Sequence, residues 1–186
     1  VEPDAPRVSI ISGCCSDAFF QGTMDADDFG ERDGVVRLTG VGNIMRWKNW
    51  LCLAEAMARL PQDQRSRLSV RIWGPTYSDA DSRAYEREIR ERIEAAGLEG
   101  RFQLCGSTGN VVPVLRRTDW MVLPSTNEPC SVALIEAMAM GRPVLASASG
   151  GNVDLVQPGV TGLLFRPDDP KDLARCLGEL ATGSVR

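Results

Sequence analysis

Two glutamates lie eight positions apart in the stretch EPCSVALIEAMAMGRPV, residues 128–144. The apolar residues after Ser131 follow helical spacing, which predicts a helix that begins near this residue. The first N–H groups of such a helix lack intrahelical acceptors and carry about half a positive charge, so they favour a phosphate. Glu136 would lie about 7 Å farther along the axis, at about 1.5 Å per residue, where its carboxylate suits the two hydroxyls of an attached ribose. Glu128 would face the other side of the phosphate. Either glutamate alone is compatible with an ordinary structural role, but the combination predicts a nucleotide site.

A second candidate segment, GVGNIMRWK, covers residues 40–48 and follows an expected strand. Its glycines half-match the G-x-G-x-x-G turn of dinucleotide-binding proteins, but Met45 occupies the third glycine position, so a tight turn is the better interpretation. Arg46 and Lys48 would bring two cations to the place where a phosphate would lie. On residue type alone, a position in solvent is equally compatible with both side chains. The chain has no G-x-x-x-x-G-K-[ST] motif, which argues against a P-loop kinase or ATPase.

The composition narrows the chemistry further. The 186 residues include no histidine, which excludes Ser-His-Asp and Cys-His catalysis and histidine-ligated metals. The six cysteines form no C-x-x-C pair, so zinc and dithiol redox sites are not indicated, and Cys130 is interpreted as a packing residue. The formal charge of −4 argues against a nucleic-acid partner. No apolar run is long enough to span a bilayer.

Short apolar runs alternate with helical patterns from Val35 onward. The expected strands cover residues 35–42, 68–74, 102–106, 119–124, 143–148 and 162–165. The expected helices cover residues 51–60, 79–96 and 111–117, the segment after Ser131, a short turn near Asp154 and a last helix capped by Asp169. This alternation predicts an α/β fold, a Rossmann-like parallel sheet with helices on both faces, whose ligand binds at the carboxyl ends of the strands.

EPCSVALIEAMAMGRPV resembles the E-P-F-G-x-x-x-x-E-A-M-A-x-G-x-P-V signature of retaining glycosyltransferases with the GT-B fold, the large family of glycosyl transferases group 1. Four further segments resemble motifs of that family in the same order. GVGNIMRWKNW is similar to its G-R-L-x-x-x-K-G turn, and FQLCG to the strand and glycine of its base-binding loop. DWMVLPS is similar to A-D-x-x-x-x-P-S, and GGNVDLVQPGVTGLLF to G-G-x-x-E-x-V-x-x-G-x-x-G-x-L-F. The resemblance runs from about Val35 to the end of the chain.

The resemblance implies that the chain is the C-terminal, donor-binding half of a two-domain enzyme. VSIISGCCSDAFF resembles a degraded form of the family's interdomain segment, so residues 1–34 are expected to be an interdomain strand and linker remnant, and residues 35–186 a nucleotide-sugar-binding domain. The N-terminal acceptor-binding half would be missing, and its acceptor would be a sugar, a lipid-linked group or a small molecule. We expect a cytoplasmic enzyme that reaches the membrane surface only through the missing half, and a chain that is inactive alone.

The family's functional residues map onto Lys48, which would neutralise the diphosphate, and Glu128, which would contact the donor sugar. Asn43 stands where the family has an arginine, and Arg46 is expected to supply the missing charge, so the expected catalytic residues are Glu128, Lys48 and Arg46. Glu136 would hold the ribose, and the amides near Val132 and Ala133 would hold the distal phosphate. The loop from Gly106 to Val111 would receive the base. The expected donor-binding set is Asn43, Lys48, Gly106, Ser107, Cys130, Ser131, Val132, Ala133 and Glu136.

Three departures from the family pattern affect the site. Cys130 and Ser131 replace an aromatic residue and a glycine, which predicts a donor-sugar pocket of different shape, and Asp154 replaces a glutamate. The implied mechanism is electrostatic: cations and helix amides stabilise the nucleoside diphosphate as it leaves, with retention of the anomeric configuration. The sequence shows no metal-ligand cluster, and no metal or other cofactor is expected.

Two alternatives remain open at the level of sequence. Nucleotide-sugar epimerases share the fold and use similar glutamate contacts, although the absence of histidine counts mildly against their acid–base chemistry. A non-catalytic nucleotide-sugar-binding module is indicated by the loss of the family arginine at Asn43.

Overall fold

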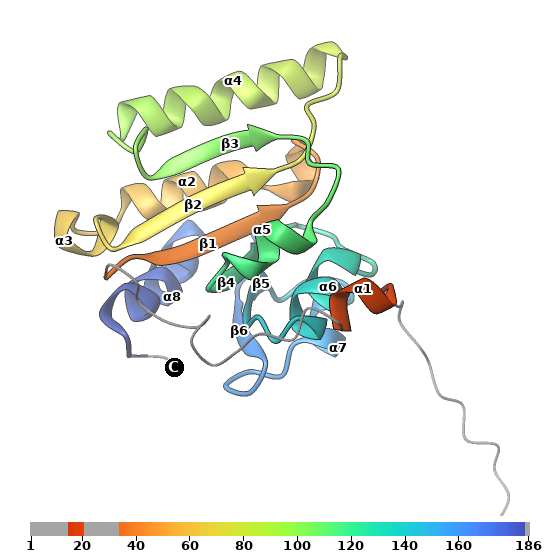
Figure 1. Cartoon of the computed structure of the whole chain (residues 1–186). Helices are drawn as coiled ribbons and strands as arrows, with labels where there is room; N and C mark the ends of the chain where they lie inside the picture. Colours follow the sequence, from red (N-terminus) through yellow and green to blue (C-terminus); the bar gives the residue numbers. More distant parts are fainter. Residues whose placement is uncertain (1–14, 21–33, 185–186) are drawn as a thin grey trace, which may run out of the picture.

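The computed structural model describes residues 15–20 and 34–184, and most of the expected interdomain segment lies outside these residues. Within them the chain forms one parallel sheet in the order β3-β2-β1-β4-β5-β6 (Figure 1). The strands are β1 Val36–Val41, β2 Leu68–Trp73, β3 Phe102–Gly106, β4 Trp120–Leu123, β5 Val144–Ser147 and β6 Gly162–Phe165. All five strand pairs are parallel, and the predicted Rossmann-like sheet is confirmed.

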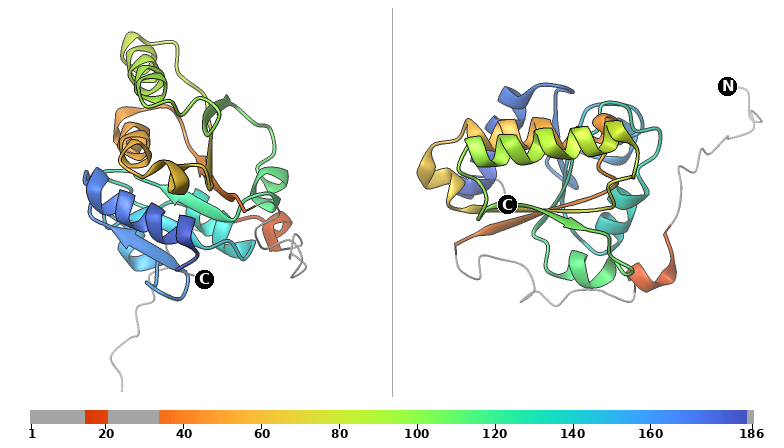
Figure 2. Two further views of the ribbon diagram at one scale, coloured as in Figure 1. Left: turned by 90° about the vertical axis from the view of Figure 1, so that its left-hand side faces the viewer. Right: turned by 90° about the horizontal axis from the view of Figure 1, so that it is seen from above.

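Helices cover both faces of the sheet (Figure 2). α2, α4 and α8 lie on one face, and α1, α5 and α6 lie on the other (Figures 1 and 2). The helices are α1 Asp17–Phe20, the 3-10 turn η2 Arg46–Lys48, α2 Trp50–Ala58, α3 Gln62–Arg65, α4 Ala80–Ala95, α5 Val112–Arg116, α6 Val132–Ala139, α7 Asn152–Leu155 and α8 Pro170–Thr182.

The predicted helix boundaries have their expected caps. The Asp169 carboxylate accepts the N–H groups of Lys171 and Asp172, and Pro170 occupies the first helical position of α8. Gly97 follows α4 in the left-handed conformation, as expected for a glycine that ends a helix. Ser131 caps α6 through its hydroxyl, which accepts the N–H of Leu134 at 3.3 Å. The helix predicted to begin near Ser131 is therefore confirmed.

The core lies between the sheet and its helices. Six of the nine residues of α2 are buried, because α4 and α8 flank this helix on the sheet. α4 instead buries a stripe at helical spacing, Tyr85, Ile89 and Ile93, and exposes its charged residues.

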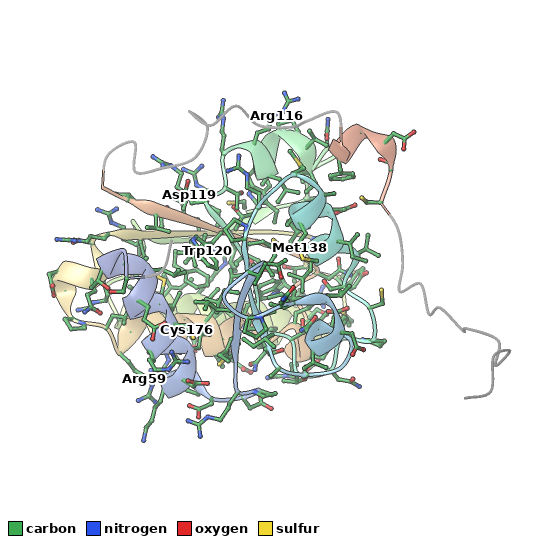
Figure 3. All side chains as sticks on the ribbon, turned by 90° about the horizontal axis from the view of Figure 1, so that it is seen from below. Arg59, Arg116, Asp119, Trp120, Met138 and Cys176 are labelled. Atoms are coloured by element: carbon green, nitrogen blue, oxygen red, sulfur yellow. The ribbon has the colours of Figure 1, made fainter. Side chains whose placement is uncertain are left out.

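Figure 3 shows Arg59 and Arg116 projecting outward from opposite sides of the molecule, with Trp120 and Asp119 of the sheet region between them. None of the helices described here combines the length and the apolar character that a bilayer crossing requires.

Trp50 fixes the turn between β1 and α2. Its side chain is fully buried, and its indole N–H donates to the backbone carbonyl of Asn43 at 3.0 Å. The ring lies against Gly40 so closely that a Cβ atom at Gly40 would be 2.6 Å from a ring carbon. The glycine at this position therefore allows β1 and Trp50 to hold the turn that carries Arg46 and Lys48.

We expect Gly40→Ala to lower the free energy of unfolding by about 1–3 kcal/mol, because the added methyl group overpacks the contact with Trp50. Urea denaturation measures the effect. Gly100→Ala is the matched control, since a Cβ atom there meets nothing within 4 Å, and it should change stability by less than about 0.5 kcal/mol. Equal stability of the two variants would contradict the packing argument.

Candidate functional site

The carboxyl edge of the sheet brings together two charged residues that are 80 positions apart. Lys48 follows β1, Glu128 follows β4, and the Lys48 ammonium nitrogen lies 2.6 Å from Oε2 of Glu128. Both residues are buried, with 9% and 5% of their surfaces exposed. Because β1 and β4 are neighbours in the sheet, the order of the strands places the two loops side by side.

The position of Lys48 is set by the short turn η2. Asn49 follows it in the left-handed conformation (φ 57°), which asparagine adopts more readily than most residues, and the chain then enters α2. The ammonium group lies 4.2 Å from the centroid of the Trp47 ring, in a cation–π contact. The Trp47 carbonyl accepts the backbone N–H of Thr126 at 2.9 Å. The loop after β4 is therefore attached directly to the turn that carries Lys48.

Glu128 is held by contacts to its side chain and to its backbone. The Ser125 hydroxyl donates to Oε2 at 3.1 Å, and the N–H of Gly151 donates to the Glu128 carbonyl at 2.8 Å. Gly150 has a positive φ of 54°, and a Cβ atom there would lie 2.3 Å from the same carbonyl oxygen. The two glycines of GGNVD therefore pack against the backbone of EPCS, and two segments separate in sequence form one surface.

The N-terminus of α6 lies directly after Glu128 and offers free amides. The N–H groups of Val132 and Ala133 have no acceptor among the described residues, and Val132 is 48% exposed. These are the two amides predicted to bind the distal phosphate. Val132 and Ala133 lie in the first turn of α6, where backbone N–H groups have no intrahelical acceptor. The capping hydroxyl of Ser131 accepts the N–H of Leu134 instead.

Glu136 lies farther along α6 and is half-buried, and its carboxylate has no hydrogen bond or ion pair within the described part of the chain. Burial raises the pKa of its carboxyl group above the ordinary value for glutamate. An ionised carboxylate that is partly removed from water without a partner is unfavourable in the ligand-free protein, and a ligand with hydroxyl donors would relieve that cost.

The Arg46 side chain, which was expected to supply charge to the diphosphate, is paired with α4 in the structure. Its guanidinium donates to the Asp81 carboxylate at 3.0 Å and to both oxygens of Glu88 at 2.9 and 2.7 Å, and it stacks over the Tyr85 ring. These partners all belong to α4, and they raise the pKa of Arg46 still further above its ordinary value. Arg46 is only three positions after Asn43 in the sequence. Its side chain nevertheless binds the two carboxylates on α4.

Asn43 itself donates to the Tyr77 hydroxyl at 2.7 Å, so the loops after β1 and β2 are joined by a neutral hydrogen bond. Gly106 has a left-handed φ of 75°, and Ser107 is exposed. The Cys130 side chain is half-buried beside the N-terminus of α6. The structure thus places the predicted residues on the loops, turns and helices that follow the strands, with Gly106 at the end of β3 and Glu136 within α6. Among the described residues, Lys48 and Glu128 are the predicted pair from separate loops that is joined by a side-chain hydrogen bond.

Two residues of the site were not identified from the sequence. Ser125 lies in the segment DWMVLPS, which marks the loop after β4, but no sequence signal gives its hydroxyl a partner. Tyr77 has no signal beyond its place in the loop after β2. A cavity of about 460 Å³ on the α5 face of β1 and β2 is lined by Thr108 and Asn110 of the loop expected to receive the base, and by none of the individually predicted site residues. No cluster of acidic or sulfur-bearing residues suited to a metal occurs in the described ranges.

Comparison with known proteins gives this geometry a context. The family model of glycosyl transferases group 1 matches residues 36–182. The chain belongs to the glycosyl transferases group 1 family. D-inositol 3-phosphate glycosyltransferase of Corynebacterium jeikeium is 36% identical over 146 residues, which are 75% of this chain and 34% of that protein. The chain thus spans about a third of the length of curated relatives such as this one.

Solved structures show the same fold. HepE of Anabaena, crystallised in complex with UDP, matches with a TM-score of 0.77 and 22% identity, over 89% of this chain and 46% of that chain. The C-terminal domain of a glycosyl transferase group 1 protein, LpcC of Francisella tularensis, matches with a TM-score of 0.70 and 20% identity, over 80% of this chain and 76% of that domain. The predicted Rossmann-like domain of the GT-B type is therefore confirmed.

Loss of either member of the buried ion pair should destabilise the protein. We expect Lys48→Met to lower the free energy of unfolding by about 3–5 kcal/mol, because it leaves the Glu128 charge buried without its cation. Glu128→Gln should also destabilise the protein, and the double variant should be more stable than the sum of the two losses predicts. Urea unfolding of all four proteins gives the coupling energy. Additive losses would show that the two charges do not interact in solution.

Glu136→Gln should raise the melting temperature of the ligand-free protein at pH 7. The raised pKa of Glu136 means that ionisation costs stability in the folded state, and this cost grows as the pH rises through the folded-state pKa. The gap between the two proteins should close as the pH falls toward the ordinary pKa of a glutamate, where both side chains are neutral. Thermal unfolding across this pH range is the measurement, and a gap that widens on acidification would contradict the assignment.

Proposed function

We propose that this chain is the donor-binding part of a retaining glycosyltransferase and that it binds a nucleoside diphosphate sugar at the carboxyl edge of its sheet. The observation that carries the proposal is the buried Lys48–Glu128 pair beside the free amides of Val132 and Ala133. Lys48 contacts Glu128, and the two N–H donors follow Glu128 in the chain at the start of α6. One cation, two N–H donors and one carboxylate match the charges of a diphosphate joined to a sugar.

Each group has a distinct role in the proposed site. Lys48 and the amides of Val132 and Ala133 would receive the diphosphate, whose negative charge grows as the bond to the sugar breaks. Glu128 would accept hydrogen bonds from hydroxyls of the transferred sugar. Glu136, half-buried and without a partner, would accept hydrogen bonds from the ribose, and the loop that begins at Gly106 would receive the base through its backbone.

We further propose that the reaction needs no metal ion, because Lys48 and the helix amides supply the positive potential that the leaving group requires. Retention of the anomeric configuration follows from the resemblance of EPCSVALIE to the signature of retaining enzymes. Two of the groups that act on the leaving diphosphate are backbone amides, which are fixed in place before the ligand arrives and cost no reorganisation.

Structural neighbours guide the choice of donor. HepE of Anabaena has been crystallised with UDP, with UDP and glucose, and with UDP-glucose. These ligands are therefore the first probes for the present chain. The short span of the match to curated relatives supports a second, acceptor-binding half in the complete enzyme. We propose that transfer to a sugar, a lipid-linked group or a small-molecule acceptor requires that half, and that the present chain binds its donor without turnover.

A non-catalytic binding module is the second candidate, and the placement of Arg46 favours it. With Arg46 paired to α4 and Asn43 in a neutral hydrogen bond, Lys48 is the one cationic side chain of the proposed diphosphate site within the described residues. Product analysis of the complete protein with donor and acceptor distinguishes the two candidates. Slow formation of a glycosylated product indicates a transferase, and the absence of any product indicates a binding module.

We expect isothermal titration calorimetry to show binding of a nucleoside diphosphate in the presence of excess EDTA. Glu136→Ala should weaken binding by about 1–3 kcal/mol, the range for lost hydrogen bonds to a charged group. Arg46→Ala is the control and should bind like the wild type, because its guanidinium lies on α4. Binding that disappears with EDTA and returns with manganese would contradict the metal-free proposal, and unchanged affinity of Glu136→Ala would remove that residue from the site.

A further inference from the structure

We infer that Ser125 is a positioning residue that orients the Glu128 carboxylate and gives its two oxygens different partners. Oε2 is occupied by protein donors, and Oε1 is left for the donor sugar. This inference rests on the proposed function, since it assigns a direction to the contact between Glu128 and the sugar.

The two carboxylate oxygens have different surroundings. Oε2 accepts from the Lys48 ammonium at 2.6 Å and from the Ser125 hydroxyl at 3.1 Å. Oε1 has no hydrogen-bond partner among the described residues. It is not one of the fully buried atoms that lack a partner, so it is accessible to water. A terminal carboxylate rotates broadly about its last torsion. Two donors on one oxygen restrict that rotation and keep the other oxygen directed outward.

Ser125 can act as an anchor because its own backbone is held from a second loop. Its carbonyl accepts from the Ser149 hydroxyl at 3.0 Å and also from the Ser147 hydroxyl. The Asn152 amide donates to the Ser147 carbonyl at 3.1 Å, and Asn152 is fully buried. The segment after β5 therefore fixes the loop after β4, and the buried Ser125 hydroxyl transmits that position to Glu128.

This arrangement predicts an effect on the sugar without an effect on the diphosphate. Lys48 still bonds to Glu128 when the Ser125 hydroxyl is removed, and the amides of α6 are untouched. The carboxylate, however, retains only one of its two donors and samples more orientations. The loss should therefore appear in binding of the intact nucleotide-sugar and be small for the nucleoside diphosphate alone.

The test compares the two ligands on the wild-type chain and on Ser125→Ala by calorimetry, with three probe pairs: UDP and UDP-glucose, GDP and GDP-mannose, ADP and ADP-glucose. For the pair that binds, the affinity for the sugar nucleotide should fall at least about fivefold relative to that for the diphosphate, the scale of the net contribution of one hydrogen bond. Ser125→Cys keeps a weak donor and should lose less. Ser82→Ala removes an equally buried hydroxyl at the start of α4 and should leave the ratio unchanged.

The outcomes separate the inference from the proposed function. Equal weakening of both ligands by Ser125→Ala would assign Ser125 a general structural role, and an unchanged ratio would deny it any role, so either result overturns the inference alone. If the folded wild-type chain binds none of the six probes, the proposed function fails and the inference fails with it. Should Ser125→Ala not fold, an unchanged affinity ratio in Ser125→Cys would overturn the inference.

Discussion

The buried ion pair between Lys48 and Glu128 is the interaction on which the rest of the site depends. Removing two charges from water costs several kcal/mol per ion, and only close geometry with further hydrogen bonds repays that cost. Here the 2.6 Å contact, the Ser125 hydroxyl and the Trp47 ring supply these compensations. Because the two residues follow different strands, the pair forms only if the strand order and both loops are correct.

The same interaction links the stability of the fold to the chemistry that we propose. Lys48 and Glu128, which neutralise each other in the fold, are also the residues that would meet a nucleotide-sugar. A diphosphate offers Lys48 a second anionic partner, and sugar hydroxyls offer Glu128 new donors, so ligand binding replaces solvent at a site that is already polarised. Glu136 follows the same pattern, since its burial without a partner disfavours the charge that a ribose would stabilise.

The sequence predicted the architecture because each strand is a short apolar run and each helix has a recognisable boundary. Ser131 and Asp169 cap the helices that their positions indicated. The contact between Lys48 and Glu128 required the strand order, which hydrophobic periodicity does not encode. The partners of Arg46 were not predicted for a related reason. Distance along the chain favoured the phosphate, whereas the carboxylates of Asp81 and Glu88 become neighbours only after α4 has packed beside α2. Ser125 was missed because its partner is set by the conformation of the loop after β4.

A crystal structure of the chain with an intact nucleoside diphosphate sugar tests the central claim most directly. The account predicts that the Lys48 ammonium contacts a phosphate oxygen while Glu128 retains a bond to Lys48 through Oε2 and accepts a sugar hydroxyl at Oε1. It also predicts ribose hydroxyls within hydrogen-bond distance of Glu136. A diphosphate bound elsewhere, with Lys48 and Glu128 engaged only with each other, would contradict it.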